Sequence, residues 1–433
     1  MKDKSRFVDS AKNILILLLL ISAVFLFFKA VLYEPDSIFA DFFPRFSDNR
    51  EIVQPDAGQT SETILAAKPV YVLVTTEDGS HYAVKYSSQD REKMLSQFSS
   101  ALGEALGSSS SPAEISLAKW QQALGGSGVF FDYLYPQPLW VIAISLGTDV
   151  KGIASSDSAR RLFLGNENGN LMLYYISAVS GKIFRCETAL SFSTLASKIS
   201  EYPMGNAKFA FELGGAYENL DPFFIFSGET CDLRAAGVSN PLHGDYSKSA
   251  LLNVFGINIR AASEYSEADG SIVYVEGEKS LRIESSGRVL FNVTGKSGIP
   301  VRHSSENLTI NDCLSACSEI VRTSVGGICG DAELGIADID SSKFPSEISV
   351  NFQYFLDGLP VILPNGSYAA SFSVDSGFIK RAEFYFRQYS LSGDALVALP
   401  EKQAAAIVMA SGGEPVLVYE DKADSVSYSW IVK

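Results

Sequence analysis

The best candidate for acid or base chemistry in this sequence is His243, which precedes Asp245 by two residues in the segment NPLHGDYS. An imidazole beside a carboxylate can take up and release protons near neutral pH. The other histidines, His81 and His303, have no histidine or cysteine at helical spacing, which argues against a zinc site. A loop histidine next to an aspartate is more often hydrogen-bonded within a turn, so a structural role for His243 is the stronger interpretation.

A second group of candidate ligands lies in YSEADGSIVYVEGEKSLRI, residues 265–283. Glu267, Asp269 and Gly270 are spaced like the start of a calcium-binding loop, in which oxygen ligands alternate along the chain. After the glycine, however, a strand-like run follows, and the next acids come about four extended residues later, roughly 13 Å away. Because Asp-Gly between apolar runs is a strong turn signal, we predict a hairpin and no metal site.

The five cysteines indicate neither a disulfide framework nor a zinc site, because their number is odd and CxxC spacing is absent. Cys313 and Cys317 are four residues apart on a predicted helix and therefore face the same way. This pair could be oxidised, or could bind a soft metal, but no third ligand lies at the required spacing. Buried core thiols are the stronger interpretation.

No other motif indicates catalysis. The sequence has no GxSxG nucleophile motif, and GGSG at 125–128 is too short for a phosphate loop and lacks its lysine. The 50 acidic residues are so frequent that spacing alone does not nominate a glycosidase pair. We therefore predict no catalytic, cofactor-binding or metal-binding residue, no cofactor, and a protein that is not an enzyme.

The size and charge of the chain limit its partners. With 433 residues, 46% of them hydrophobic, the chain is large enough for two or three domains with real cores. Its formal net charge is −15. So acidic a chain is repelled by phosphate backbones and by anionic lipid head groups, which argues against nucleic acid or a peripheral membrane surface as a partner.

The N-terminal region predicts a membrane anchor. Residues 14–33, ILILLLLISAVFLFFKAVLY, are almost continuously apolar, and about 20 helical residues span a bilayer core of roughly 30 Å. No small-x-small cleavage site follows, so an uncleaved anchor at 13–33, surrounded by membrane lipid, is favoured over a signal peptide. Positive charges before the run place residues 1–12 in the cytoplasm and the bulk of the chain outside it. We predict a single-pass cell-membrane protein.

The remaining sequence predicts an α+β ectodomain in several parts. A proline-containing stalk at 34–66 is followed by an N-terminal α+β domain at 67–205, a β-rich middle domain at 206–300 and a C-terminal α+β domain at 301–433. Strand–turn–strand patterns recur without a fixed period, which indicates antiparallel meanders with helices packed on one face rather than a solenoid. The predicted turns are Asp78-Gly79, Asn168-Gly169, Asp269-Gly270, Asp357-Gly358 and Ser376-Gly377.

Periodicity and capping signals predict the individual elements. Ser88 is the expected N-cap of a helix at 88–106, and Thr309 with Asp312 is expected to form a capping box. Further helices are predicted at 115–124 and from Pro400 to Gly412-Gly413, and another is expected to end at about residue 202. The strands are expected at 69–76, 81–87, 129–136, 138–146, 160–166, 170–177, 208–213, 223–228, 347–356, 359–364, 368–375, 379–389, 415–420 and 427–432.

Several of these segments resemble one known family. NVFGINIRAASEYSEADGSIVYVEGEKSLRIESSGRVLF, residues 253–291, resembles the middle of YycH-type proteins, which are membrane-anchored accessory regulators of the essential cell-wall sensor kinase of low-GC Gram-positive bacteria. FQYFLDGLPVILP, ALPEKQAAAIV and the final SYSWIV are similar to the end of YycH and of its partner YycI. These motifs are structural and contain no catalytic residues.

The resemblance implies a function without a reaction. Family members bind a sensor histidine kinase, largely through the transmembrane helix, and adjust its activity together with YycI. A sensor histidine kinase and a YycI-like protein are therefore the expected partners, with residues 14–33 and the ectodomain making the contacts. The alternative is a membrane-anchored extracytoplasmic enzyme or ligand-binding module of the cell envelope, with His243 and Asp245 near a cleft. A purely structural envelope protein is a third alternative.

Overall fold

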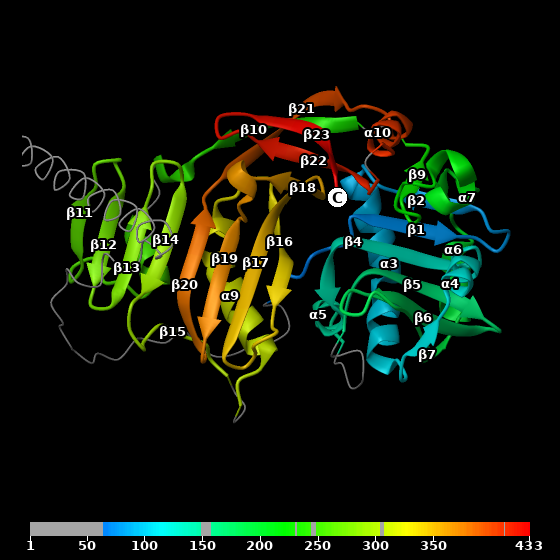
Figure 1. Ribbon diagram of the computed structural model, residues 1–433, viewed down its shortest axis with the longest axis horizontal. Helices are drawn as coiled ribbons and strands as arrows, with labels where there is room; N and C mark the ends of the chain where they lie inside the picture. Colours follow the sequence, from blue (N-terminus) through cyan, green and yellow to red (C-terminus); the bar gives the residue numbers. More distant parts are fainter. Residues whose placement is uncertain (1–63, 149–156, 230–231, 244–247, 304–306, 411) are drawn as a thin grey trace, which may run out of the picture. The chain divides into compact units, whose positions relative to one another are not determined.

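The structure is a computed structural model that describes residues 64–148, 157–229, 232–243, 248–303, 307–410 and 412–433 (Figure 1). The predicted cytoplasmic segment 1–12, the predicted anchor 13–33 and nearly all of the predicted stalk 34–66 lie outside the described residues. Within the described ranges, no helix combines the length and the apolar character needed to cross a membrane.

The first half of the described chain builds a nine-stranded antiparallel sheet, with the strand order β3-β7-β6-β5-β4-β1-β2-β8-β9. Its strands are β1 (Tyr71–Thr75), β2 (His81–Val84), β3 (Ala113–Ile115), β4 (Gly128–Pro138), β5 (Ser158–Glu167), β6 (Asn170–Ser177), β7 (Ile183–Ser191), β8 (Ala207–Phe209) and β9 (Ile225–Ser227).

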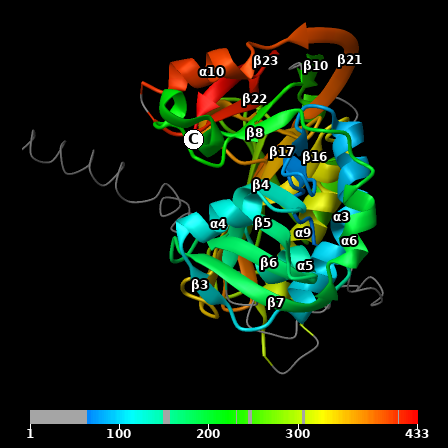
Figure 2. The same ribbon diagram turned by 90° about the vertical axis from the view of Figure 1, so that its right-hand side faces the viewer.

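Helices cover both faces of this sheet, and Figure 2 shows α3 and α4 on opposite sides of its strands. One face packs against α3 (Ser88–Ser108), α5 (Leu139–Ser145) and α6 (Ser193–Ile199). The other face packs against α4 (Leu117–Leu124), whose Trp120 is fully buried among aromatic rings. The prediction of helices on one face only is therefore wrong for this sheet, because β1 and β4 are buried on both sides.

The second half builds a twelve-stranded sheet in which all neighbours are antiparallel except β18 and β22. Its strands are β11 (Ser263–Ser266), β12 (Ile272–Glu276), β13 (Lys279–Ile283), β14 (Arg288–Val293), β15 (Ile299–Pro300), β16 (Glu333–Asp340), β17 (Glu347–Leu356), β18 (Leu359–Ile362), β19 (Ala370–Asp375), β20 (Phe378–Tyr385), β22 (Pro415–Asp421) and β23 (Val426–Val432).

Over β14, β19, β20 and most of β17, one face of the second sheet is covered by helices and the other carries polar side chains, whereas β22 is buried on both faces. α8 (Lys248–Val254) and α9 (Ile310–Thr323) pack on the apolar face, which includes Phe352, Phe372 and Phe384. In Figure 1, α9 lies behind β17 and β19. The alternation of strand residues places half-buried Asn351 and Ser371 on the opposite face. Here the prediction of helices on one face agrees with the structure.

The remaining elements connect the two sheets. β10 (Asp232–Ser239) and β21 (Gln388–Val397) form a separate antiparallel ribbon. α7 (Ala210–Leu213) follows β8, and α10 (Glu401–Val408) precedes β22; both contribute to a small apolar cluster with Phe224 and Phe226. All of the described residues belong to one compact unit. The predicted divisions 67–205, 206–300 and 301–433 stay a prediction, which limited proteolysis would test.

All five predicted X-Gly turns lie between consecutive strands of a hairpin. At Asn168-Gly169, Asp357-Gly358 and Ser376-Gly377 both residues have positive φ, as a type I′ turn requires. At Gly79 and Gly270 the glycine alone has positive φ. The turns were predictable because their geometry depends on two adjacent residues rather than on distant packing.

The predicted strand at 138–146 is wrong, since Leu139–Ser145 is the helix α5. The run LWVIAIS is apolar on all sides, so periodicity does not distinguish a buried strand from a buried helix. The helix is apolar on all sides because it is buried between two cores: Val141 belongs to the core of the second sheet, and Ile142 to that of the first.

Smaller differences concern helix ends and strands without a sequence signal. Ser87, not Ser88, caps α3 and accepts a hydrogen bond from the Asp90 backbone N–H. The capping box of Thr309 and Asp312 is confirmed. The strand predicted at 208–213 ends at Phe209, after which α7 begins. The sequence did not predict β7, β10, β16 or most of β21. Three of these strands contain alternating small or charged residues, so their composition resembles that of loops.

Candidate functional site

The structure places His243 in a solvated turn. It is exposed in the short 3₁₀ segment Pro241–His243, and its Nε2 lies 3.3 Å from the amide nitrogen of Asn240. The side chain of Asn240 also accepts a hydrogen bond from the backbone N–H of Leu242 and donates to the Ser285 carbonyl. Asp245 lies outside the described residues. The surroundings of His243 are those of a turn, which was the structural alternative for this residue.

The acids of the hairpin 265–283 are paired with arginine. Glu267 Oε2 lies 2.9 Å from Arg282 Nη1, and Asp269 Oδ2 lies 2.6 Å from Arg282 Nη2. The backbone N–H of Ser271 donates to Asp269, and this hydrogen bond is the main cause that lowers the pKa of that carboxyl. Among the described residues, no group of three or more His, Cys, Asp or Glu side chains is arranged to hold a metal. These carboxylates balance the charge of Arg282.

The cysteines of α9 are buried thiols. Cys313 and Cys317 are both fully buried and unbridged, as the interpretation of core thiols requires. Burial raises the pKa of Cys313 to about 11 and raises that of Cys317 well above its usual value. At neutral pH both are therefore neutral thiols that pack in the core rather than nucleophiles.

An acid–histidine–hydroxyl series that the sequence did not reveal lies at the edge of the first sheet. The Nε2 atom of His81 lies 3.0 Å from Oε1 of Glu212, and its Nδ1 lies 2.9 Å from Oγ1 of Thr75. Burial opposes ionisation of Glu212, but the hydrogen bond and charge of His81 outweigh it and lower the carboxyl pKa. The series has the same order of groups as a catalytic triad.

Its burial argues against catalysis. Thr75 is completely buried and His81 is 3% exposed, so neither offers a surface to a substrate. The Thr75 hydroxyl lies 3.1 Å from the Leu124 carbonyl, and Glu212 accepts the backbone N–H of Phe209. These bonds attach α7 and the end of α4 to the β1–β2 hairpin. The series is therefore a structural connection.

The largest charged cluster is built around Asp132 on β4. Its carboxylate accepts hydrogen bonds from Arg160 and Arg161, two consecutive residues of β5. Consecutive strand residues normally point to opposite faces, but the register of β5 shifts against both neighbours here, which lets both side chains reach one carboxylate. Arg161 also binds Asp221 at 2.8 Å and Glu414 at 3.1 Å. Burial opposes ionisation of Asp132, but the two arginines outweigh it and lower its pKa.

A second buried pair joins α10 to the first sheet. Lys85 is completely buried, and its Nζ donates to Glu401 Oε1 at 2.6 Å and to the Ile225 carbonyl at 2.7 Å. The hydroxyl of Tyr86 donates to the same oxygen of Glu401. The ammonium also lies 4.4 Å from the ring centre of Phe224. Together with Glu414, these contacts fix the C-terminal segment to the first sheet.

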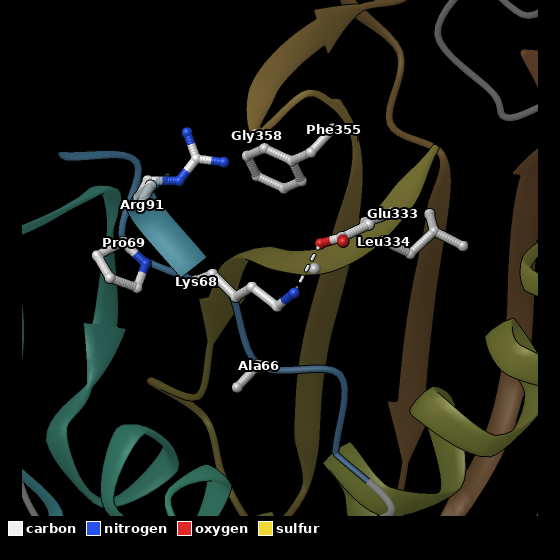
Figure 3. A pocket seen from close by; sticks show the side chains of 9 residues that line it. Ala66, Lys68, Pro69, Arg91, Glu333, Leu334, Phe355 and Gly358 are labelled. Carbon is white, nitrogen blue, oxygen red and sulfur yellow. Dashed lines mark ion pairs between the residues drawn. The ribbon is translucent and has the colours of Figure 1, made fainter. Parts of the chain in front are cut away.

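A small pocket lies where the described chain begins (Figure 3). Its volume is about 40 Å³, and it is lined by Ala66, Lys68, Pro69, Arg91, Glu333, Leu334, Gly335, Phe355 and Gly358. Lys68 pairs with Glu92 at 2.9 Å and with Glu333 at 3.0 Å. Arg91 of α3 is 4% exposed and donates to two backbone carbonyls, Lys85 O at 3.4 Å and Asp357 O at 3.3 Å. Burial lowers the pKa of Arg91, and nearby carboxylates offset only part of this effect.

An apolar surface lies beside the last strand. Glu414 and Lys433 exchange both backbone hydrogen bonds, so the alternation along β23 points the N–H and C=O groups of Tyr428, Trp430 and Val432 away from β22. Within the described chain, β22 is the only strand that pairs with β23. The side chains of Tyr428 and Trp430 donate to the carbonyls of residues 397 and 399. Val397 and Val432 are 70% and 52% exposed.

We call this region the C-terminal edge and define it as β23 with Val397 and Leu399. It combines an unpaired row of backbone groups with exposed aliphatic side chains, which is the arrangement to which an added strand can bind. The sequence did not predict it, because an edge strand and a central strand have the same apolar composition. Its position is visible beside the C-terminus in Figure 1.

Comparisons with known proteins bear on the fold. No protein-family model matches the sequence, and no curated protein matches it. Among solved structures, the chain is similar to the crystal structure of YycH from Bacillus subtilis, with a TM-score of 0.55 and 13% sequence identity. The match covers 88% of this chain and 97% of that chain. The chain therefore has a YycH-type fold, which confirms the structural expectation drawn from residues 253–291.

Proposed function

We propose that this chain, with its YycH-type fold, is a non-enzymatic accessory regulator of a membrane sensor histidine kinase. The observation that carries the proposal is the match of nearly the whole chain to YycH. Residues 13–33 serve as its single membrane anchor in this proposal, with residues 1–12 in the cytoplasm, membrane lipid around residues 14–33, and the described chain outside the cytoplasm.

The geometry of the charged groups is consistent with a protein that binds rather than reacts. The clusters around Asp132, Lys85 and His81 are buried and saturated by contacts within the protein, so their role is to hold elements together. A regulator needs a rigid ectodomain that presents a fixed surface, and buried ion pairs between distant segments supply that rigidity.

We assign the ectodomain contact with the partner to the C-terminal edge. The partners are the kinase and a YycI-like protein, and one of them adds a strand to β23. Backbone hydrogen bonds would pair with Tyr428 and Trp430, while alternate apolar side chains of the added strand would lie beside Val397 and Leu399. A second copy of this chain is a poorer occupant, because each copy carries a formal charge of −15.

The test is co-purification of the full-length protein with the kinase and the YycI-like protein from the same membranes, together with a signalling assay in a deletion strain. The proposal predicts recovery of at least one partner and altered kinase signalling on deletion. Recovery of neither, combined with wild-type signalling, contradicts it.

Substitutions on the C-terminal edge locate the contact. Val432→Pro removes an N–H that points away from β22, so it blocks an added strand without breaking the β22–β23 ladder. We expect it to reduce partner recovery at least about tenfold. Val179→Pro is the control, because Val179 is also an exposed valine, at 77% against 52% for Val432, and lies in a turn of the first sheet. Equal recovery of the partner with both variants would show that the partner does not bind to β23.

Two further variants distinguish the proposed regulator from the alternative, an extracytoplasmic enzyme or ligand-binding module. His243→Ala removes the exposed imidazole, and replacement of residues 14–33 by an unrelated anchor removes any specific transmembrane contact. A regulator that binds through its membrane helix loses function in the second variant and keeps it in the first. The opposite pattern favours the alternative.

A further inference from the structure

The Arg91 guanidinium is buried without a carboxylate partner. It is 4% exposed, yet among the described residues no Asp or Glu oxygen lies within 4.0 Å of it, and its two hydrogen bonds to carbonyls are long. The carboxylates that act on Arg91 from a longer distance have other partners: Glu92 and Glu333 pair with Lys68, and Asp357 is directed to Arg234. A buried charge without a counterion is costly, so a missing partner is expected.

The pocket beside Arg91 has room for that partner. Its volume of about 40 Å³ exceeds the roughly 10–15 Å³ that one water molecule needs. Lys68 and Arg91 both line the pocket; in Figure 3, Lys68 extends toward Glu333 and the guanidinium of Arg91 lies on the side of Gly358. Gly358 has a positive φ of 74°, which favours glycine, and a methyl group at this position would overlap Nη2 of Arg91 unless that side chain moved.

We propose that this pocket binds one compact oxyanion, a carboxylate or phosphate group, between Arg91 and Lys68. The planar guanidinium presents paired N–H groups that match two oxygens of such an anion, and the ammonium adds a second positive charge at the pocket wall. Glu333, on the same wall, pairs with Lys68 and opposes the anion. Binding therefore requires Lys68 to divide its contacts between Glu333 and the ligand.

The anion also affects the segment that enters the fold. Ala66, Lys68 and Pro69 line the pocket, and the preceding Leu65 is hydrogen-bonded to Ser318 and to Ile336. An anion between Lys68 and Arg91 connects this segment to α3 and to the β17–β18 turn. Occupancy of the pocket therefore decreases local opening of residues 64–69.

Calorimetric titration of the full-length protein in detergent with inorganic phosphate and with acetate is the direct test. A five-atom anion is expected to bind with a dissociation constant on the order of 0.1–1 mM. Arg91→Gln is expected to weaken binding at least about tenfold. Heat from neither anion overturns the proposal, and so does binding that Arg91→Gln leaves unchanged.

A second pair of variants does not depend on the buried arginine. Glu333→Gln removes the opposing carboxylate from a 62% exposed side chain, so it should tighten phosphate binding about threefold to tenfold. Glu187→Gln makes the same charge change on a 67% exposed side chain that does not line the pocket, and it should have no effect. Equal effects of the two variants would mean that only net charge matters and would overturn the site.

The source of the group is identified by two further probes. A short peptide with a free C-terminal carboxylate is compared with the same peptide ending in an amide. Binding of the free-acid peptide that is stronger than that of the amide peptide and of acetate indicates a peptide carboxylate, whereas phosphate binding alone indicates a free anion. Hydrogen exchange of residues 64–69 should slow when the pocket is occupied, and unchanged exchange would refute the link to the entering segment.

Discussion

Two buried arginines in this protein differ in what balances their charge. Arg161 contacts three carboxylates, Asp132, Asp221 and Glu414, which come from separate segments of the chain. Arg91 is as deeply buried and contacts backbone carbonyls only. A buried cluster of paired charges holds segments together, whereas a buried charge without a paired carboxylate, next to a cavity, indicates a place for a ligand.

The largest expected effect is the loss of Arg161. In Arg161→Met, buried carboxylates lose a counterion, so we expect the free energy of unfolding to decrease by about 3–5 kcal/mol. Urea denaturation monitored by tryptophan fluorescence measures the change. Arg185→Met is the control, since Arg185 pairs with the half-exposed Glu167 and should contribute at most about 1 kcal/mol. If both variants lost a similar amount of unfolding free energy, the Asp132 cluster would contribute no more to stability than an exposed ion pair does.

A slightly smaller effect is expected for the pair that holds α10. Lys85→Met leaves Glu401 buried, but this carboxylate keeps its bonds to Tyr86 and to the backbone N–H of Ser227. We expect the free energy of unfolding to decrease by roughly 3 kcal/mol. Hydrogen exchange should also show faster exchange in residues 401–408 than elsewhere. Uniform acceleration across the protein would argue that Lys85 does not act on α10 in particular.

The pH dependence of stability tests the same cluster without replacing an arginine. The pKa of Asp132 is lower in the folded state than in the unfolded state, because Arg160 and Arg161 stabilise its charge. Its contribution to stability is therefore complete above the unfolded value of about 3.9 and is lost as the pH falls toward the folded value. Asp132→Asn should flatten the decline of stability below about pH 4. An unchanged decline would show that other carboxylates dominate acid unfolding.

The smallest expected effect is that of Arg91. In Arg91→Met an apolar side chain replaces a buried charge that has no paired carboxylate, so the free energy of unfolding should change by less than about 1 kcal/mol in buffer without phosphate. Added phosphate should stabilise the wild-type protein and leave the variant unchanged. A loss as large as that of Arg161→Met would mean that Arg91 has a structural role like that of Arg161, and the comparison would fail.

The sequence predicted those parts of the fold that depend on neighbouring residues. The capping box at Thr309 and the turn at Asn168-Gly169 are determined by contacts within four residues, and both are present. The helix at Leu139–Ser145 was predicted as a strand, because its uniformly apolar run contains no periodicity. The resemblance at residues 253–291 led to the correct fold even though overall identity to YycH is 13%.

The charged clusters could be identified only from the tertiary structure. His81 and Glu212 are 131 residues apart, and Lys85 and Glu401 are 316 apart, so no local pattern links them. In a chain with 50 acidic residues, each arginine has many possible partners in the sequence. Arg91 illustrates the limit most clearly, because the feature that distinguishes it is that no carboxylate of the described residues forms an ion pair with it.

The sequence by itself therefore determined the α+β class, the hairpin turns, the capping box at Thr309 and the acidic character of this protein. These properties follow from backbone preferences and composition, which act over a few residues or over the whole chain. The tertiary structure alone decided which charges are neutralised, which strand edge stays open and where a pocket remains. Those outcomes depend on side chains that meet only after distant segments have packed, when burial makes each unpaired charge or backbone group costly.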